Sequence, residues 1–262
     1  MVSSYRTVWL SDVHLGTKAS RARDLLHFLN SVDADRIYLV GDIIDLERMK
    51  SRPRFPETHR QVVSRIIELA SSGTDVIYIP GNHDVEFRNV VGKVFFAIPV
   101  LLEAEHKTPT GQRLLITHGD VLDGRIRQGT NLQKFGAAAY KLLMEFDVLV
   151  NRMRLLLGHE YFSISASIKR RLSGANEHIR RFEIVAAEYA LERGFDGIVC
   201  GHIHRPCVRM IKGCLYANDG DWVEHGTALA ERPDGTLEVL EMHTGSPFVA
   251  DVFALSETMA AA

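Results

Sequence analysis

The chain has 262 residues, a hydrophobic content of 46% and a formal net charge of −2. This length and composition suffice for one substantial core, in one large domain or in one domain with an insertion. The near-neutral charge excludes the broad basic field of a protein that binds nucleic acid non-specifically. No stretch approaches the ~18–20 apolar residues of a membrane span, and residues 1–10 lack the apolar core of a signal peptide.

In the first third of the chain, strands and helices alternate. Apolar runs at 7–10, 37–40 and 76–79 predict three buried strands. Patterns of helical period at 25–29 and 58–72 predict the two helices that connect them. This alternation is typical of parallel βαβ units, whose ligands collect at the carboxyl ends of the strands. We therefore expect an α/β fold.

The remainder of the chain changes character twice. A fourth strand is predicted at 114–117, and the pattern from 121 to 193 is helical, which we interpret as a helical cap inserted between residues 1–120 and 194–245 of a sheet domain. Residues 246–262 are expected to form a weakly ordered C-terminal tail. A fifth strand at 197–200 is followed by short strands that favour an antiparallel second sheet, at 207–211, 214–217, 227–231 and 237–241.

The three cysteines are Cys200, Cys207 and Cys214. An odd number without a CxxC pair argues against a disulfide framework. We expect reduced thiols that pack on neighbouring strands, and hence a cytoplasmic protein.

Metal-ligating side chains follow the predicted strands. His202 and His204 are two residues apart, so on a strand end their imidazoles point the same way, and Gly201 lets the backbone approach a neighbour closely. Four earlier strand ends supply further ligands. The collected set is Asp12, His14, Asp42, Asn82, His118, His202 and His204.

Three oxygen and four nitrogen ligands are too many for one tetrahedral ion. They suit two ions of higher coordination, about 3.5–4 Å apart, with a bridging carboxylate and water. Asp42 is the natural bridge, because Gly41 before it permits close approach. Mixed carboxylate and imidazole ligation favours Mn²⁺, with Fe²⁺ or Zn²⁺ as alternatives, over Mg²⁺ or Ca²⁺.

The motifs DVH (12–14), GDIID (41–45), GNHD (81–84), HGD (118–120) and GHIH (201–204) resemble those of the calcineurin-like metallophosphoesterases. The resemblance implies a four-layer α/β/β/α sandwich with a dimetal centre and phosphoester hydrolysis by a metal-activated hydroxide. It assigns one metal to Asp12, His14, Asp42 and His204, and the other to Asp42, Asn82, His118 and His202.

The same resemblance gives His83 a catalytic role, as a proton donor to the leaving oxygen or as a stabiliser of the phosphoryl group. Asp84 is predicted to orient His83 as a second catalytic residue. Asp45 and Asp120 are candidates for holding metal ligands. For all three carboxylates, Asp84 included, ordinary turn or capping roles are the alternative.

Within the superfamily the chain most resembles the cytoplasmic UDP-2,3-diacylglucosamine diphosphatases of lipid A synthesis and their relatives. The helical insertion and the stretches 216–224 and 227–229 carry this resemblance. The sequence departs from the best-known branch at position 83, where that branch has Arg and this chain has His. Other lipid or nucleotide diphosphates therefore stay open as substrates.

The predicted cap has an apolar stripe and a basic remainder, which suits an amphiphilic substrate: a groove for acyl chains and cations for a diphosphate. The alternative is a core stripe with a solvated basic face. A basic amphipathic cap also suggests peripheral contact with the inner membrane, on its cytoplasmic face. The predicted substrate-binding residues are Arg88, Asp123, Arg125, Lys169, Arg170 and Arg171.

Three functions compete at this stage. The first is a dimetal pyrophosphatase that cleaves a nucleotide-linked acylated sugar to UMP and an acyl-sugar phosphate. The second keeps the chemistry but acts as a phosphodiesterase or phosphomonoesterase on another lipid or nucleotide, with nucleic acid disfavoured by the charge. The third is a non-catalytic scaffold, which the intact ligand set disfavours. The sequence leaves the oligomeric state open.

Overall fold

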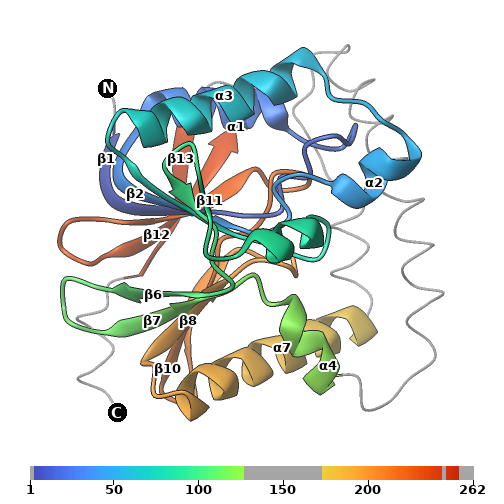
Figure 1. The fold of residues 1–262 in the computed structure, drawn as a ribbon. Coiled ribbons are helices and arrows are strands. Elements are labelled where there is room, and N and C mark those ends of the chain that lie inside the picture. Colours follow the sequence, from blue (N-terminus) through green and yellow to red (C-terminus); the bar gives the residue numbers. More distant parts are fainter. Residues whose placement is uncertain (1–2, 127–172, 244–245, 254–262) are drawn as a thin grey trace.

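The computed structural model describes residues 3–126, 173–243 and 246–253, and the predicted mixed α/β class is confirmed. Its larger sheet has six strands in the order β13-β12-β11-β1-β2-β3 (Figure 1). These strands are β1 (Ser3–Leu10), β2 (Val32–Val40), β3 (Asp75–Ile79), β11 (Thr227–Glu231), β12 (Leu237–His243) and β13 (Ser246–Phe253).

The second sheet has five strands in the order β6-β7-β8-β10-β9. A small hairpin of β4 and β5 joins β3 through a bridge between Tyr78 and Val100. The bounds are β4 (Val94–Phe95), β5 (Ile98–Pro99), β6 (Ala104–Lys107), β7 (Arg113–Ile116), β8 (Gly197–Cys200), β9 (Cys207–Ile211) and β10 (Cys214–Asn218).

Helices connect the strands and cover the outer faces of both sheets. Helix α1 buries Leu25, Phe28 and Leu29, which share one face because they are three or four residues apart. The described helices are α1 (Ala22–Ser31), α2 (Leu46–Ser51), α3 (Glu57–Ser71), the 3₁₀ turns η1 (Val85–Val90) and η2 (Asp120–Leu122), α4 (Asp123–Ile126) and α7 (Ser173–Glu192).

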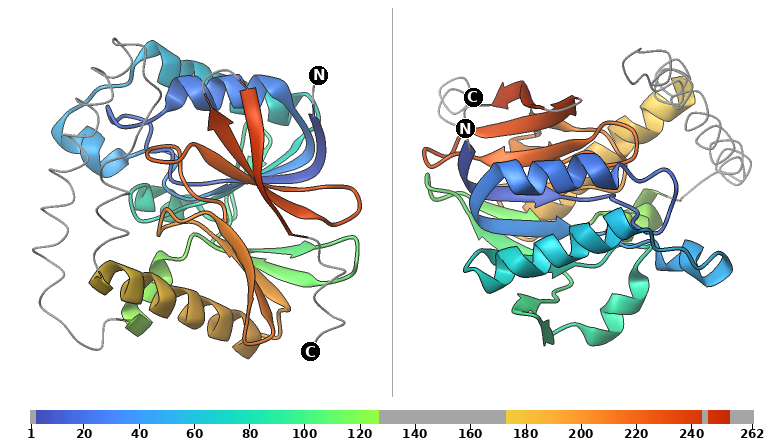
Figure 2. Two further views of the ribbon diagram at one scale, coloured as in Figure 1. Left: turned by 180° about the vertical axis from the view of Figure 1, so that it is seen from behind. Right: turned by 90° about the horizontal axis from the view of Figure 1, so that it is seen from above.

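The layers follow one another in the order helix, sheet, sheet, helix (Figures 1 and 2). Helices α1 and α3 lie on the six-stranded sheet, and α7 lies on the five-stranded sheet. The end of strand β2 is a continuous apolar run because both of its faces are buried. Ile37 and Leu39 pack toward the helices, whereas Tyr38 and Val40 pack between the sheets. Burial on both faces removes the polar alternation.

The predicted parallel units are confirmed, because β1 pairs parallel with β2 and β2 with β3. Strands β7 and β8 are also parallel, in the second sheet. The cysteines lie on neighbouring strands of that sheet, as predicted, and no disulfide joins them.

The prediction of one antiparallel second sheet is wrong for the last strands. β9 and β10 join the five-stranded sheet, whereas β11 pairs antiparallel with β1 in the six-stranded sheet and β12 pairs antiparallel with β11. Leu215 of β10 and Leu229 of β11 are buried in the same core between the sheets. Because that core takes apolar residues from both sides, the pattern does not reveal to which sheet a strand belongs.

The predicted boundary of the cap is also corrected. Helix α7, assigned to the insertion, is instead a layer of the sheet domain, because Phe182 and Ala186 pack against Ile198 and Tyr216 of the second sheet. The rest of the predicted cap, residues 127–172, lies outside the described residues.

The predicted tail begins with a strand. β13 pairs antiparallel with β12 along its length and forms one edge of the six-stranded sheet. Its sequence, SPFVADVF, is rich in aromatic and β-branched residues, which favour a β-strand that pairs with the edge strand β12. None of the helices within the described ranges has the length and hydropathy of a membrane span.

Candidate metal centre

Five loops converge on one edge of the molecule, where β1, β2, β3, β7 and β8 end. The backbone N–H of Asp12 donates to the carbonyl of Gly41 (3.0 Å), and that of His14 donates to Asp42 (2.9 Å). The two sheets are joined at the same place, because the N–H of His202 donates to Oδ2 of Asp12 (2.8 Å). The predicted ligand loops are therefore tied to one another by hydrogen bonds.

The backbone of these loops is strained. Among the described residues, eight other than glycine have a φ in the left-handed region, which L-residues rarely adopt. Five of the eight are predicted metal ligands. Such strain persists where the surrounding structure holds it, and it gathers at functional sites. These five are Asp12 (52°), His14 (51°), Asp42 (54°), His202 (68°) and His204 (52°).

Glycines allow the loops to approach, as predicted for Gly41 and Gly201. A Cβ at Gly41 would overlap the imidazole of His118, and a Cβ at Gly201 would overlap Ser11 and Asp12. A side chain at either position would therefore push a predicted ligand out of place.

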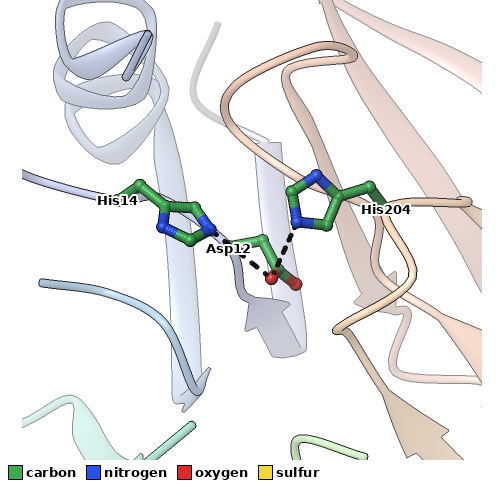
Figure 3. A group of neighbouring side chains, drawn as sticks. All are labelled: Asp12, His14 and His204. Atoms are coloured by element: carbon green, nitrogen blue, oxygen red, sulfur yellow. Dashed lines mark hydrogen bonds and ion pairs between the residues drawn. The ribbon is translucent and has the colours of Figure 1, made fainter. Parts of the chain in front are cut away.

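One group of ligands consists of Asp12, His14 and His204 (Figure 3). The Oδ1 atom of Asp12 lies 3.0 Å from Nε2 of His204 and 3.9 Å from Nε2 of His14. Nδ1 of His14 lies 3.3 Å from Asp45, so that Nε2 is directed toward the carboxylates. Asp45 thus orients a predicted ligand from behind, the role proposed for it from the sequence.

A second group consists of Asp12, Asp42 and His118. Nε2 of His118 lies 3.4 Å from Oδ2 of Asp42, which is also 3.9 Å from Nε2 of His14. Asp42 therefore lies between the two groups, as expected of a bridging ligand. Nδ1 of His118 lies 2.8 Å from the carbonyl of Val40. Because a carbonyl only accepts, Nδ1 carries a hydrogen, so Nε2 presents a lone pair whenever the ring is neutral, which is the form that binds a metal ion.

The two remaining predicted ligands lie beside this second group. The ring of His202 is 5.2 Å from that of His118. Asn82 is exposed in the loop that follows β3. A Cβ at the preceding Gly81 would overlap Oδ1 of Asp42, so the loop that carries Asn82 passes directly over the bridge position.

The charges in the group compensate one another. Burial opposes the ionisation of Asp12, but the neighbouring imidazoles, His204 above all, hold the pKa of Asp12 below its usual range. Burial also opposes protonation of His14, yet the contact with Asp45 and the charge of Asp42 raise its pKa to about 9. Protonated imidazoles therefore balance the carboxylates, and an incoming divalent ion would displace those protons.

The donor set fits two divalent ions. Two ligands about 2.1 Å from one ion are separated by about 3.0 Å at right angles and about 4.2 Å when opposite. The distances given above, from 3.0 to 3.9 Å, fall in this range. Nε2 of His118 is buried and makes no hydrogen bond of good geometry within the described part of the chain. It faces Oδ2 of Asp42 at 3.4 Å, where an ion between them could bind both atoms.

The structure separates the two predicted catalytic residues. Nδ1 of His83 lies 3.3 Å from Asp45, and its ring packs edge-on against His14 at 4.7 Å. Asp84 was predicted to orient His83, but its carboxylate instead accepts from Tyr78 Oη (2.5 Å) and from the backbone of Gly81 (2.6 Å). Burial raises the pKa of Asp84. Asp84 is therefore a buried support of the loop, and Asp45 takes the place beside His83.

The predicted substrate-binding residues fall into three sets. Arg88 binds both carboxylate oxygens of Asp120 (2.8 and 2.7 Å), and Asp123 lies 3.2 Å from Nε2 of His202, so these two adjoin the ligand loops. Arg125 pairs with Glu192 and is directed to α7 rather than to the ligands. Lys169, Arg170 and Arg171 lie outside the described residues.

Sequence analysis missed two residues that support the ligands. Ser11 and Asp219 form a buried hydrogen-bonded pair behind Asp12. Asp219 belongs to the stretch 216–224 that carried the family resemblance, but its spacing from the motifs gives no sign of this contact.

Comparison with known proteins agrees with this geometry. A sequence model of the calcineurin-like phosphoesterase family matches residues 5–206, and the chain belongs to that family of metal-dependent hydrolases. It is 24% identical over 245 residues to the UDP-2,3-diacylglucosamine hydrolase of Shewanella sp. (strain W3-18-1), covering 88% of this chain and 94% of the relative. The enzyme of the same name from Chromohalobacter salexigens is 26% identical over 214 residues, 77% of this chain and 81% of the relative.

Among solved structures, Yfce, a phosphoesterase from E. coli, aligns with a TM-score of 0.48 at 17% identity. The alignment covers 95% of this chain and 98% of that chain.

Proposed function

We propose that the protein is a dimetal phosphohydrolase that cleaves the diphosphate of UDP-2,3-diacylglucosamine, or of a similar lipid-linked nucleotide, to UMP and an acyl-sugar phosphate. The observation that carries the chemistry is the meeting of five ligand loops around Asp12 and Asp42, with five left-handed residues in three of those loops. The names of the relatives support the choice of substrate.

The ligand groups suggest which residues would hold each ion. Asp42 would be shared between the ions, and the mixed oxygen and nitrogen donors favour Mn²⁺, with Fe²⁺ or Zn²⁺ as alternatives. When bound, two divalent ions lower the pKa of a water between them and neutralise the phosphoryl oxygens. One ion would take Asp12, His14, Asp42 and His204, and the other Asp42, Asn82, His118 and His202.

The chain's own residues add orientation and a proton. Asp45 lies 3.3 Å from Nδ1 of both His14 and His83, so one carboxylate fixes a ligand and the neighbouring acid together. With Nδ1 of His83 directed to Asp45, a protonated ring presents Nε2–H outward. There it can donate to the leaving oxygen or stabilise the phosphoryl group.

The decisive assay is hydrolysis of UDP-2,3-diacylglucosamine by the purified protein with Mn²⁺, followed by ³¹P NMR. We expect UMP and an acyl-sugar phosphate, and loss of both products when the ions are chelated. If the protein hydrolyses bis-p-nitrophenyl phosphate but releases no UMP from UDP-2,3-diacylglucosamine, it is a phosphohydrolase with a different substrate. Mass spectrometry of lipid that co-purifies with the Asp42→Ala variant then identifies the alternative.

We also propose that the enzyme meets its acylated substrate at the cytoplasmic face of the inner membrane, as a peripheral protein. Arg180 and Arg181 are exposed on α7, in line with the basic character of the adjoining segment. Anionic lipid attracts such residues, and salt screens the attraction. We expect co-sedimentation with anionic liposomes that weakens as the salt concentration rises. A protein that stays in the supernatant at low salt would rule this contact out.

A further inference from the structure

Ser11 lies between two buried carboxylates. Its Oγ atom is 2.6 Å from Oδ2 of Asp12 and 2.6 Å from Oδ1 of Asp219. Both Asp12 and Asp219 are completely buried. Distances of 2.6 Å are typical of O–H···O hydrogen bonds on both sides of the hydroxyl.

Counting hydrogens shows that one carboxyl group is protonated. A serine hydroxyl has one hydrogen and can donate it to only one of its two neighbours. The other neighbour must then donate to Oγ, and only a protonated carboxyl group can do so. The Ser11 hydroxyl therefore connects one acid and one carboxylate.

The surroundings identify the protonated member. Oδ2 of Asp12 also accepts the backbone N–H of His202 (2.8 Å), and Oδ1 lies 3.0 Å from Nε2 of His204, so Asp12 is the ionised partner. Oδ2 of Asp219 is buried without a hydrogen-bond partner within the described ranges, which is costly for an anion and tolerable for a neutral acid. Burial raises the pKa of Asp219 well above its usual value; the charge of Asp12 assists it, whereas the hydrogen bond with Ser11 and the neighbouring His118 oppose it.

The pair determines how Asp12 is presented. With the Ser11 hydroxyl and the His202 N–H both donating to Oδ2, the Oδ1 atom is left to face His204 and His14. A neutral Asp219 gives this orientation without adding a negative charge to the site. Hydrogen-bonded partners of this kind commonly orient metal ligands.

We propose that Asp219 is a neutral carboxylic acid and a positioning residue, which acts through Ser11 to direct Oδ1 of Asp12 to the metal. The metal part of this inference rests on the proposed function, whereas the protonation of Asp219 does not.

The protonation state is measured on the metal-free protein. Aspartate labelled with ¹³C at the carboxyl carbon gives one resonance for each aspartate, and the signal lost in Asp219→Asn assigns Asp219. We expect this resonance to stay at the position of a protonated acid at pH 7. A carboxylate shift at that pH would overturn the proposal, whether or not the protein binds metal.

The positioning role is measured as Mn²⁺ affinity by titration calorimetry. Asp219→Asn keeps a donor to Ser11 Oγ, and we expect its affinity to stay within about twofold of the unmodified protein. Ser11→Ala and Asp219→Ala break the connection, and we expect each to weaken binding by about 10- to 100-fold. We expect Asp219→Ala to have no added effect in the Ser11→Ala background, because both act through one hydroxyl.

Asp221 supplies the matched control for the Asn substitution. It lies in the same turn but accepts the N–H of Val223 (2.8 Å) and pairs with Nδ1 of His225 (2.5 Å), as an anion does. We expect Asp221→Asn to lower the melting temperature and Asp219→Asn to leave it unchanged. Equal loss of Mn²⁺ affinity in Asp219→Asn and Asp219→Ala would overturn the positioning role. A lack of Mn²⁺ binding by the unmodified protein would overturn it together with the proposed function, but not the ¹³C result.

Discussion

Replacement of Asp42 by Ala is expected to lower kcat/KM for phosphoester hydrolysis by at least about 10³-fold. Oδ2 of Asp42 lies within 3.9 Å of Nε2 of both His14 and His118, so its loss removes the group shared by both ligand sets. Metal ions contribute several kcal/mol of charge stabilisation in the transition state, and about 4 kcal/mol corresponds to about 10³-fold in rate. The measurement is hydrolysis of bis-p-nitrophenyl phosphate at saturating Mn²⁺.

Two companion variants separate chemistry from folding. Asp42→Asn keeps the side-chain volume and an oxygen acceptor for the backbone N–H of His83 (2.7 Å), so the loop keeps its hydrogen bond. We expect Asp42→Asn to fold like the unmodified protein but to lose Mn²⁺ binding and activity, as we expect of Asp42→Ala. Asp75→Ala removes a carboxylate from a surface pair with Arg36 and is expected to retain full activity. Full activity in Asp42→Ala would contradict the proposal that Asp42 is the ligand shared by both ions.

The positions of three predicted ligands could be foreseen because strands that alternate with helices indicate parallel βαβ units. Three parallel strands end at one edge, so Asp12, Asp42 and Asn82 had to lie near one another once β1, β2 and β3 were recognised. The contribution of the second sheet was harder to foresee. His118 and His202 follow β7 and β8 of the second sheet. No local sequence pattern indicates that the ligand loops of this sheet meet the ligand loops of the six-stranded sheet.

The conformation of the ligand loops was not predictable from residue types. Aspartate and histidine tolerate a positive φ better than most residues, but they usually occupy the ordinary φ regions, so residue type alone does not single out Asp12, His14 and Asp42 as left-handed. Long-range hydrogen bonds, such as that from the N–H of His14 to Asp42, hold this geometry. Only the assembled structure contains these contacts, so propensity carries no trace of them.

The carboxylates that contact the ligand histidines from behind show the same limit. Asp84 directly follows His83 in the sequence and Asp45 does not, so the sequence favoured Asp84 as the carboxylate that orients His83. The structure directs Asp45 to His14 and His83, and it directs Asp84 to Tyr78, a residue without a motif. The choice depends on where β3 delivers the GNHD loop relative to the end of β2, which is a property of packing.

Replacement of His83 by Ala is expected to lower kcat by about 10²- to 10⁴-fold, the usual contribution of a general acid or base, while Mn²⁺ stoichiometry is unchanged. The ring lies beside the ligands rather than among the predicted ones. It contacts His14 edge-on at 4.7 Å and pairs with Asp45 through Nδ1. Metal content therefore reports on the predicted ligands, whereas turnover also reports on His83. The matched control is His27→Ala, an exposed histidine on α1, for which we expect no change.

A series of aryl phosphodiesters distinguishes the two roles open to His83. If Nε2 donates a proton to the leaving oxygen, the loss in His83→Ala grows as the leaving phenol becomes more basic, because a poorer leaving group depends more on the acid. If a cationic His83 stabilises the phosphoryl group instead, the loss is the same across the series. Loss of bound Mn²⁺ from His83→Ala would make the residue a ligand and contradict both roles. Unchanged turnover of every ester by His83→Ala would show that His83 takes no part in the hydrolysis. A proton donor would then have to come from another residue at the same edge of the sheets.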